Sequence, residues 1–398
     1  SNTMGSSTCC RCFIFSLALL ISLAVILYAL SLALRSSDDQ KASTSPGPRA
    51  SESLRFIVVV SRHGNRGPVF NFPNSPYPVN DTKYWPYGMK KLTPRGRIQL
   101  YNLGVKIRSL YNGFLDQLYY TGDFYASSTP MDRVLMSGEA FLAGLYPPSG
   151  FQLWNKKILW QPIPIYSNSL DKTIVLGACP RFLEERSNYT QIFVREYSAN
   201  LSSIVGYISN QTGVNITGSY GFSMAWDMFA CEDYEGYTLP DWTKLIYPEP
   251  MNKLAGNNYI AYFAASDIMI RLLIGPFFGE MLGILENKVN GTLTPDRKMY
   301  FYSGHDTSLI TLQLVLGIPQ ADITSVVKPG SAMIFELHQD LKTNEYSIQV
   351  LYIDSSSSDL NPVLLNIPDC GNACNFGQFI NITRKFANVT NYEQECQT

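Results

Sequence analysis

Two short polar strings hold the residue types best suited to chemistry in this chain. The first, Ser61 to Pro68, reads Ser-Arg-His-Gly-Asn-Arg-Gly-Pro, and the second, Ser303 to Thr307, reads Ser-Gly-His-Asp-Thr. Together they contain two of the three histidines among the 398 residues. The two strings are therefore the strongest candidates for a functional site.

In the first string, His63 lies between two guanidinium groups, those of Arg62 and Arg66. Nearby positive charge lowers the pKa of a histidine, so we expect His63 to stay neutral and nucleophilic even in mild acid. Arginine forks bind phosphate oxygens in pairs and remain charged at every working pH. Gly64 and Gly67 let the backbone pass close to a ligand. The string predicts a nucleophile beside a seat for an oxyanion.

The second string supplies the complementary groups. His305 could donate a hydrogen bond to a phosphoryl oxygen, and Asp306 could protonate a leaving oxygen. Together the two strings predict transfer of a phosphoryl group to His63. Because the nucleophile must be unprotonated and the acid protonated, and arginines lower the pKa of both, we expect an acidic pH optimum.

Each string follows an apolar run that is typical of a buried strand, 56–60 in the first case and 299–302 in the second. Both histidines should then lie at the carboxyl ends of strands, where open α/β sheets bind ligands. Thr93-Pro94 is typical of a helix start, with the threonine as cap and the proline at the first helical position. Further expected elements are strands at 124–126, 158–165, 331–337 and 346–352 and helices at 130–145 and 259–288.

These elements predict an α/β fold with a central, mainly parallel sheet flanked by helices. We expect the α/β domain to comprise residues 53–178 and 252–398. Between them, 179–251 shows helical segments without β-alternation, which predicts an inserted, mainly helical cap. The net charge of −1 and the lack of a Lys/Arg block disfavour nucleic-acid binding. Any anion bound here should be small and held locally.

The front of the chain differs from the rest. Residues 13–34 carry no charge and are long enough to cross a ~30 Å hydrocarbon core, which predicts a transmembrane signal anchor. Residues 1–12 would be a cytosolic tail and 35–52 a linker, with the catalytic body lumenal or extracellular, in the lysosome or at the cell surface. A long, cleaved signal peptide and a secreted body remain the alternative.

Glycosylation sequons and cysteines support passage through the secretory pathway. Asn-x-Ser/Thr sequons begin at Asn80, Asn188, Asn200, Asn210, Asn215, Asn290, Asn381 and Asn388. Of the eight cysteines, three precede the apolar run, which leaves an odd number in the body. At least one body thiol is therefore free or pairs between chains.

The motifs resemble those of the histidine acid phosphatases, which have Arg-His-Gly-x-Arg-x-Pro early and His-Asp late. The resemblance extends over roughly residues 54–396 and is strongest to the animal lysosomal and prostatic branch. The further matching segments are Leu92-Thr93-Pro94-Arg95-Gly96, Ser127-Ser128-Thr129 through Arg133, Trp160-Gln161-Pro162-Ile163-Pro164 and Cys179-Pro180-Arg181-Phe182.

This resemblance implies a role for each site residue and small phosphate monoesters as substrates. His63 would form a phosphohistidine, and Asp306 would give a proton to the leaving alcohol and later help water attack. The residues implied to hold the phosphoryl group are Arg62, Arg66, Arg133 and His305. No metal or other cofactor is expected, because three arginines supply the positive charge a metal would otherwise bring.

The resemblance also implies disulfides, and it has two departures. The implied bridges are Cys179 with Cys396 and Cys370 with Cys374, while the third bridge of the animal relatives lacks a partner for Cys231 here. The position after Gly64, often aspartate in the family, is Asn65, and we expect little loss of activity from this change. Related animal enzymes are often dimers, so a homodimer is a further expectation.

Three functional hypotheses follow. The first is an acid phosphatase acting on phosphate monoesters. The second is a lysophosphatidic acid phosphatase or a phytase-like specificity on the same scaffold; a mutase-like transferase is disfavoured, because mutases usually carry a glutamate acid where Asn65 stands. The third is a catalytically decayed surface or secreted antigen, against which the complete set of site residues argues.

Overall fold

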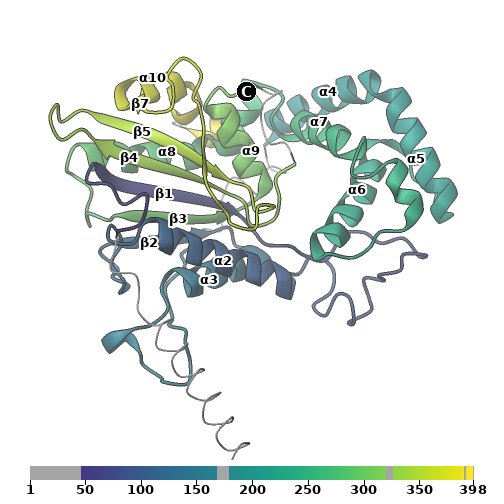
Figure 1. The fold of residues 1–398 in the computed structure, drawn as a ribbon. Coiled ribbons are helices and arrows are strands. Elements are labelled where there is room, and N and C mark those ends of the chain that lie inside the picture. Colours follow the sequence, from purple (N-terminus) through teal and green to yellow (C-terminus); the bar gives the residue numbers. More distant parts are fainter. Residues whose placement is uncertain (1–45, 168–178, 320–325, 390, 398) are drawn as a thin grey trace, which may run out of the picture. The chain divides into compact units, whose positions relative to one another are not determined.

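The computed structural model describes residues 46–167, 179–319, 326–389 and 391–397 (Figure 1). The predicted tail, membrane segment and most of the predicted linker lie outside the described residues. Gly47–Thr398 form one compact unit. Within it the linker prediction is wrong from Gly47 onward, because the Gly47 backbone N–H bonds to the Asn112 carbonyl at 2.8 Å and Arg49 pairs with the buried carboxylate of Glu336.

A mixed sheet forms the centre of the molecule. Its strands lie in the order β2-β3-β1-β4-β5-β6, and β7 pairs with β5. The strands are β1 (Leu54–Arg62), β2 (Phe124–Ser128), β3 (Met299–Gly304), β4 (Ala332–Gln339), β5 (Tyr346–Ile353), β6 (Val363–Leu364) and β7 (Cys374–Asn375). Pairing is parallel among β2, β3 and β1 and antiparallel from β1 through β4 and β5 outward. The expectation of a mainly parallel sheet therefore holds for the three strands nearest the site and not for the rest.

The sheet is covered on both faces, and the sequence of β1 explains why. Val58 and Val60 point into a core with α8 (Asp267–Val289), α9 (Asp306–Val315) and α10 (Phe376–Ala387). Ile57 and Val59 point into a second core with α2 (Pro94–Leu110) and α3 (Asp132–Leu145). Figure 1 shows these two helix layers on opposite sides of the sheet. A strand buried on both faces needs a continuous apolar run, which is what the sequence shows.

A helical cap is inserted in the chain between β2 and β3. It contains α4 (Pro180–Glu196), α5 (Ser198–Thr212), α6 (Gly218–Glu235) and the short helix Asp241–Leu245, followed by α7 (Met251–Phe263). These helices share a separate apolar cluster that includes Phe193, Ile208, Phe222 and Phe229. Within the described residues 179–263 there is no strand. The prediction of a mainly helical insertion agrees with this arrangement.

Two predicted elements are wrong. Residues 158–165 form no strand; the described chain there has one isolated bridge, between Ser127 and Tyr166. Pro162 and Pro164 explain this, because proline lacks the N–H that a strand ladder needs. The single helix expected at 259–288 is two helices, because α7 ends at Phe263 and Ser266 caps α8 by accepting a hydrogen bond from the Met269 N–H at 3.2 Å.

Within the described residues, two disulfides close the fold. They join Cys179 to Cys396 and Cys370 to Cys374, while Cys231 is free and buried. Among the described residues, α8 is the helix long and apolar enough to cross a membrane, yet 56% of its most apolar window is buried in the body. A core helix has this composition as well, and α8 packs in the core described above.

Candidate active site

The sheet brings the two strings together at the carboxyl ends of β1 and β3. Arg62 lies opposite Gly304 in the parallel register, and the backbone N–H of His63 donates to the Gly304 carbonyl at 3.0 Å. The rings of His63 and His305 are nearly perpendicular, with their centroids 5.5 Å apart. Both histidines therefore lie at the sheet edge that the sequence predicts.

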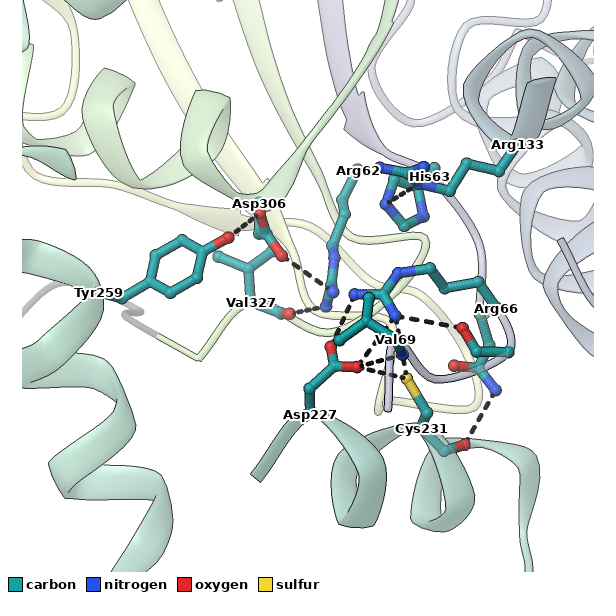
Figure 2. A network of polar contacts seen from close by, with 12 residues as sticks. Arg62, His63, Arg66, Val69, Arg133, Asp227, Cys231, Tyr259, Asp306 and Val327 are labelled. Carbon is teal, nitrogen blue, oxygen red and sulfur yellow. Dashed lines mark hydrogen bonds and ion pairs between the residues drawn. The ribbon is translucent and has the colours of Figure 1, made fainter. Parts of the chain in front are cut away.

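The hydrogen bonds of His63 fix its tautomer. The Nε–H of Arg133 lies 3.2 Å from Nε2 of His63, and because a guanidinium can only donate, Nε2 must be the acceptor (Figure 2). Nδ1 then carries the proton and donates to the Gly64 carbonyl at 2.8 Å. The lone pair of His63 thus lies on Nε2, beside a fixed cation.

Both imidazoles are held neutral. Burial lowers the pKa of His63 well below its ordinary value, and Arg62, His305, Arg133 and Arg66 lower it further. The pKa of His305 falls to about 4, chiefly through burial, although the neighbouring Asp306 opposes the shift. His63 is consequently neutral in mild acid, which is the state that a nucleophilic imidazole requires.

Three arginines surround His63. Arg62 is almost buried; its guanidinium donates to the Val327 carbonyl and pairs with Oδ2 of Asp306 at 2.9 Å. Burial lowers the pKa of Arg133 to about 10, and the positive charge of Arg66 adds to this effect. At that pKa Arg133 stays protonated throughout the acid range. Clustered, desolvated cations are costly to fold unless an anion joins them, so the arrangement suits an oxyanion.

Asp306 faces this cluster from the start of α9. Burial alone would raise the pKa of its carboxyl, but the charge of Arg62 and a hydrogen bond from Tyr259 hold the pKa below its ordinary value. Its side chain is 21% exposed. Without a ligand, the site therefore keeps an ion pair between Asp306 and Arg62. Phosphate bound to Arg62 would compete for that charge and favour protonation of Asp306.

The structure adds residues that the motifs do not indicate. Asp227 on α6 makes two hydrogen bonds to the Arg66 guanidinium, at 2.7 and 3.2 Å, and accepts from the Val69 N–H at 3.0 Å. Tyr259 on α7 donates to Asp306 at 2.6 Å. Both come from helices far along the chain from the two strings, and no local motif surrounds either of them. Only a three-dimensional arrangement could reveal them.

The departure at Asn65 has a structural reason. Its side-chain amide donates to Oε2 of Glu235 at 2.6 Å and to the Cys231 carbonyl at 3.2 Å. Thr93 donates to the same Glu235 oxygen at 2.9 Å. An aspartate at position 65 would face this carboxylate, whereas the amide bridges the loop to α6. Like charges at this distance would be costly.

The remaining candidate groups lie elsewhere. His338 is in a buried cluster, with Nε2 3.1 Å from Glu336 and Nδ1 3.0 Å from Ser53, which fits a structural role. Cys231 lies beside the site, its sulfur 3.5 Å from Arg66, and burial together with Asp227 raises the pKa of the thiol to about 12. Among the described residues, no group of three or more His, Cys, Asp and Glu side chains is placed to hold a metal.

The fold and site together define a phosphatase of the histidine type. Residues 53–353 match the histidine phosphatase superfamily (branch 2), and the chain belongs to this family. Over 367 residues it is 31% identical to lysosomal acid phosphatase of Homo sapiens, covering 88% of this chain and 82% of that protein. Prostatic acid phosphatase of Rattus norvegicus is 31% identical over 346 residues, covering 83% and 86%.

The solved structure of Hafnia alvei phytase in complex with myo-inositol hexakis sulphate is similar in fold. The TM-score is 0.62 at 18% identity, and the match covers 88% of this chain and 100% of the phytase chain. The prediction of a histidine acid phosphatase fold and family is confirmed.

Proposed function

We propose that this protein is an acid phosphatase that hydrolyses phosphate monoesters through a phosphohistidine on His63. The observation that carries the proposal is the Nε2 lone pair of a neutral His63, held beside Arg133 and within a cluster of arginines. The similarity to lysosomal and prostatic acid phosphatases over most of the chain supports it.

In the first half-reaction, Nε2 of His63 attacks the phosphorus and the bond to the leaving oxygen breaks. Arg62, Arg66 and Arg133 neutralise the charge on the phosphoryl oxygens, and His305 donates to one of them. Asp306 gives its proton to the leaving oxygen. In the second half-reaction, Asp306 accepts a proton from water as the water attacks the phosphohistidine, which releases phosphate and restores His63.

Replacing the nucleophile tests this proposal. His63→Ala should abolish release of a chromogenic phenol from its phosphate ester in mild acid, because the variant lacks the imidazole proposed to form the covalent intermediate. The wild-type enzyme mixed with a labelled substrate and quenched in alkali should carry label on His63. Turnover at the wild-type rate in the folded variant would overturn the assignment.

The same assay separates the alternatives. A decayed antigen would show no turnover in the wild-type protein on any phosphate ester. The alternative specificities would be favoured if kcat/KM for lysophosphatidic acid or an inositol polyphosphate were at least tenfold higher than for simple aryl and alkyl esters. We expect simple monoesters to be hydrolysed at rates that acidic pH increases.

We further propose that the body lies in the secretory pathway, lumenal or extracellular, with residues 13–34 as its membrane anchor. All eight sequon asparagines are exposed, which glycan addition requires. Glycosidase treatment of the protein from its native cells should lower its mass, and amino-terminal sequencing of the mature chain decides anchor against cleaved signal. An unchanged mass would contradict the lumenal body.

A second copy of the chain is the remaining proposed partner. Large apolar side chains are exposed on one surface loop, with Phe151 77%, Trp154 56% and Leu159 75% exposed. Several large apolar side chains exposed within one short segment favour an interface there. Sedimentation of the glycosylated body should give a dimer, and a purely monomeric body at micromolar concentration would contradict this proposal.

A further inference from the structure

The two carboxyl oxygens of Asp306 have different surroundings. Oδ1 accepts a hydrogen bond from the Tyr259 hydroxyl at 2.6 Å and one from the Thr307 N–H at 2.9 Å. Oδ2 contacts Nη2 of Arg62 at 2.9 Å. Figure 2 shows Tyr259 and Arg62 on opposite sides of the carboxyl group. Two neutral donors therefore bind Oδ1, whereas Oδ2 faces the arginines that we propose bind phosphate.

This asymmetry determines where a proton can sit. A carboxyl oxygen has two lone pairs in the plane of the group, and two donors already occupy those of Oδ1. Among the described residues, Oδ1 of Asp306 is the acceptor for the Tyr259 hydroxyl. The hydroxyl should therefore continue to donate to Oδ1 when Asp306 is protonated. The proton of a neutral Asp306 must then lie on Oδ2, the oxygen turned toward Arg62.

We propose that Tyr259 is a positioning residue that reserves Oδ2 of Asp306 as the oxygen that delivers the proton to the leaving group. The inference rests on the proposed function. When a phosphate ester binds, the Arg62 guanidinium transfers its contact to a phosphoryl oxygen and Oδ2 becomes free to carry a proton. As the phosphorus–oxygen bond breaks, that proton moves to the leaving oxygen, and Tyr259 and Thr307 stabilise the resulting carboxylate.

Charged and titratable groups face Asp306 from several elements. Arg62 comes from β1, Arg66 from the loop that follows, Arg133 from α3 and Tyr234 from α6, while His305 is the preceding residue. Removing the Tyr259 hydroxyl leaves all of them in place. The variant Tyr259→Phe therefore isolates one hydrogen bond without changing the net charge of the site.

The test compares Tyr259→Phe with Tyr262→Phe. Tyr262 lies on the same helix, is 38% exposed and stacks with Arg186, whose guanidinium carbon is 4.5 Å from its ring centroid. Each variant is assayed for kcat/KM from about pH 3.5 to pH 8 with an alkyl phosphate, whose leaving group needs a proton, and a nitrophenyl phosphate, whose leaving group needs little help.

We expect Tyr259→Phe to lose about tenfold in kcat/KM on the alkyl phosphate and less than about threefold on the nitrophenyl phosphate, because only the first depends strongly on the acid. In the pH profile for the alkyl phosphate, the fall of kcat/KM on the alkaline side should move to higher pH. The reason is that losing a hydrogen-bond donor to the carboxylate raises the pKa of Asp306. Tyr262→Phe should match the wild type in both respects.

Two results would overturn the inference: equal losses on both substrates with an unmoved pH profile, or no loss on either. In an Asp306→Asn background, Tyr259→Phe should add no further loss, and a multiplicative loss there would also contradict it. The inhibition constant of inorganic phosphate, unchanged within about threefold, would show that the folded site is intact. Failure of the proposed function is a separate outcome, because the wild type would then turn over neither substrate.

Discussion

At the scale of single residues, the site places uncharged imidazoles among guanidinium groups. His63 and His305 both have pKa values below that of a free histidine because of burial and the surrounding arginines. The same environment that keeps these imidazoles neutral should make the folded state sensitive to acid.

The free energy of unfolding should therefore rise with pH between about pH 4 and pH 6.5. In this range the unfolded chain protonates its histidines, whose ordinary pKa is about 6.5. Folded His305 remains unprotonated down to its pKa of about 4, so the unfolded state binds more protons and stability is lost as the pH falls. Urea unfolding at several pH values should give a contribution of up to about 1.4 kcal/mol per pH unit from each such histidine. His305→Gln should reduce the slope, and identical slopes would contradict the prediction.

Asp227 should matter more for folding than its lack of a motif suggests. It pairs with Arg66 through two hydrogen bonds, and both side chains are 14% exposed. Asp227→Asn leaves the Arg66 charge buried without its counter-ion, so we expect a loss of about 3 kcal/mol in the free energy of unfolding. Inorganic phosphate should raise the melting temperature of this variant more than that of the wild type. An equal gain in both proteins would argue against the counter-ion role.

Sequence alone predicts the groups that we propose perform the chemistry, and it misses the groups that hold them in place. His63, Arg62, Arg66, His305 and Asp306 stand in two compact strings, so residue types and spacing suffice. Asp227 and Tyr259 enter the site from α6 and α7, each as one polar residue in an ordinary helix. A single counter-ion or hydroxyl on a helix has no local pattern, because its partner is defined only by folding.

At the scale of elements, α2 and α3 pack so closely that glycines are required between them. A Cβ at Gly104 would lie 2.1 Å from the Phe141 carbonyl oxygen, and one at Gly144 would lie 2.2 Å from the Tyr101 carbonyl oxygen. These obstacles are backbone atoms, which cannot turn aside as a side chain can. Both helices pack against the same face of the sheet, and α3 carries Arg133.

Gly104→Ala should therefore destabilise the protein by about 2 kcal/mol or more, because the helices must separate to admit the methyl group. Gly206→Ala on α5 is the matched control, since a Cβ there meets nothing within 4 Å. The control should gain roughly 0.5 kcal/mol from the better helix propensity of alanine. Chemical denaturation of both variants gives the comparison, and similar effects at the two positions would be inconsistent with the packing described.

The elements themselves were predictable where burial leaves a pattern. The apolar run of β1 and the Thr93-Pro94 helix start appear as expected, with Thr93 accepting a hydrogen bond from the Gly96 N–H at 3.0 Å. The antiparallel half of the sheet was not predicted, because strand direction depends on how loops return the chain. The break between α7 and α8 was missed because apolar residues continue through Ala264 and Ala265.

At the scale of the whole molecule, one disulfide ties the start of the cap to the carboxyl end of the chain. Cys179 and Cys396 are separated by 217 positions, whereas Cys370 and Cys374 are separated by 4. Both half-cystines of the long bridge pack in an apolar cluster with Phe182 of α4 and Met269 of α8.

Removing the long bridge should cost more than removing the short one. Closing a longer loop restricts the unfolded chain more, so we expect losses of about 5 kcal/mol for Cys179→Ala with Cys396→Ala and about 2 kcal/mol for Cys370→Ala with Cys374→Ala. Thermal or urea unfolding of the two double variants measures the difference. A larger loss from the short loop would show that native-state contacts, rather than chain restriction, dominate.

The hydrogen bond from the His63 N–H to the Gly304 carbonyl joins segments that the entire cap separates in sequence. The two residues of this contact are far apart in sequence. The chain must therefore lose the conformational entropy of closing a long loop before the two strands can stabilise each other. During refolding, catalytic activity should thus return no earlier than the pairing of β1 with β3, and later than helix signals that need only local contacts. Recovery of turnover is then a kinetic reporter of the longest-range step in folding.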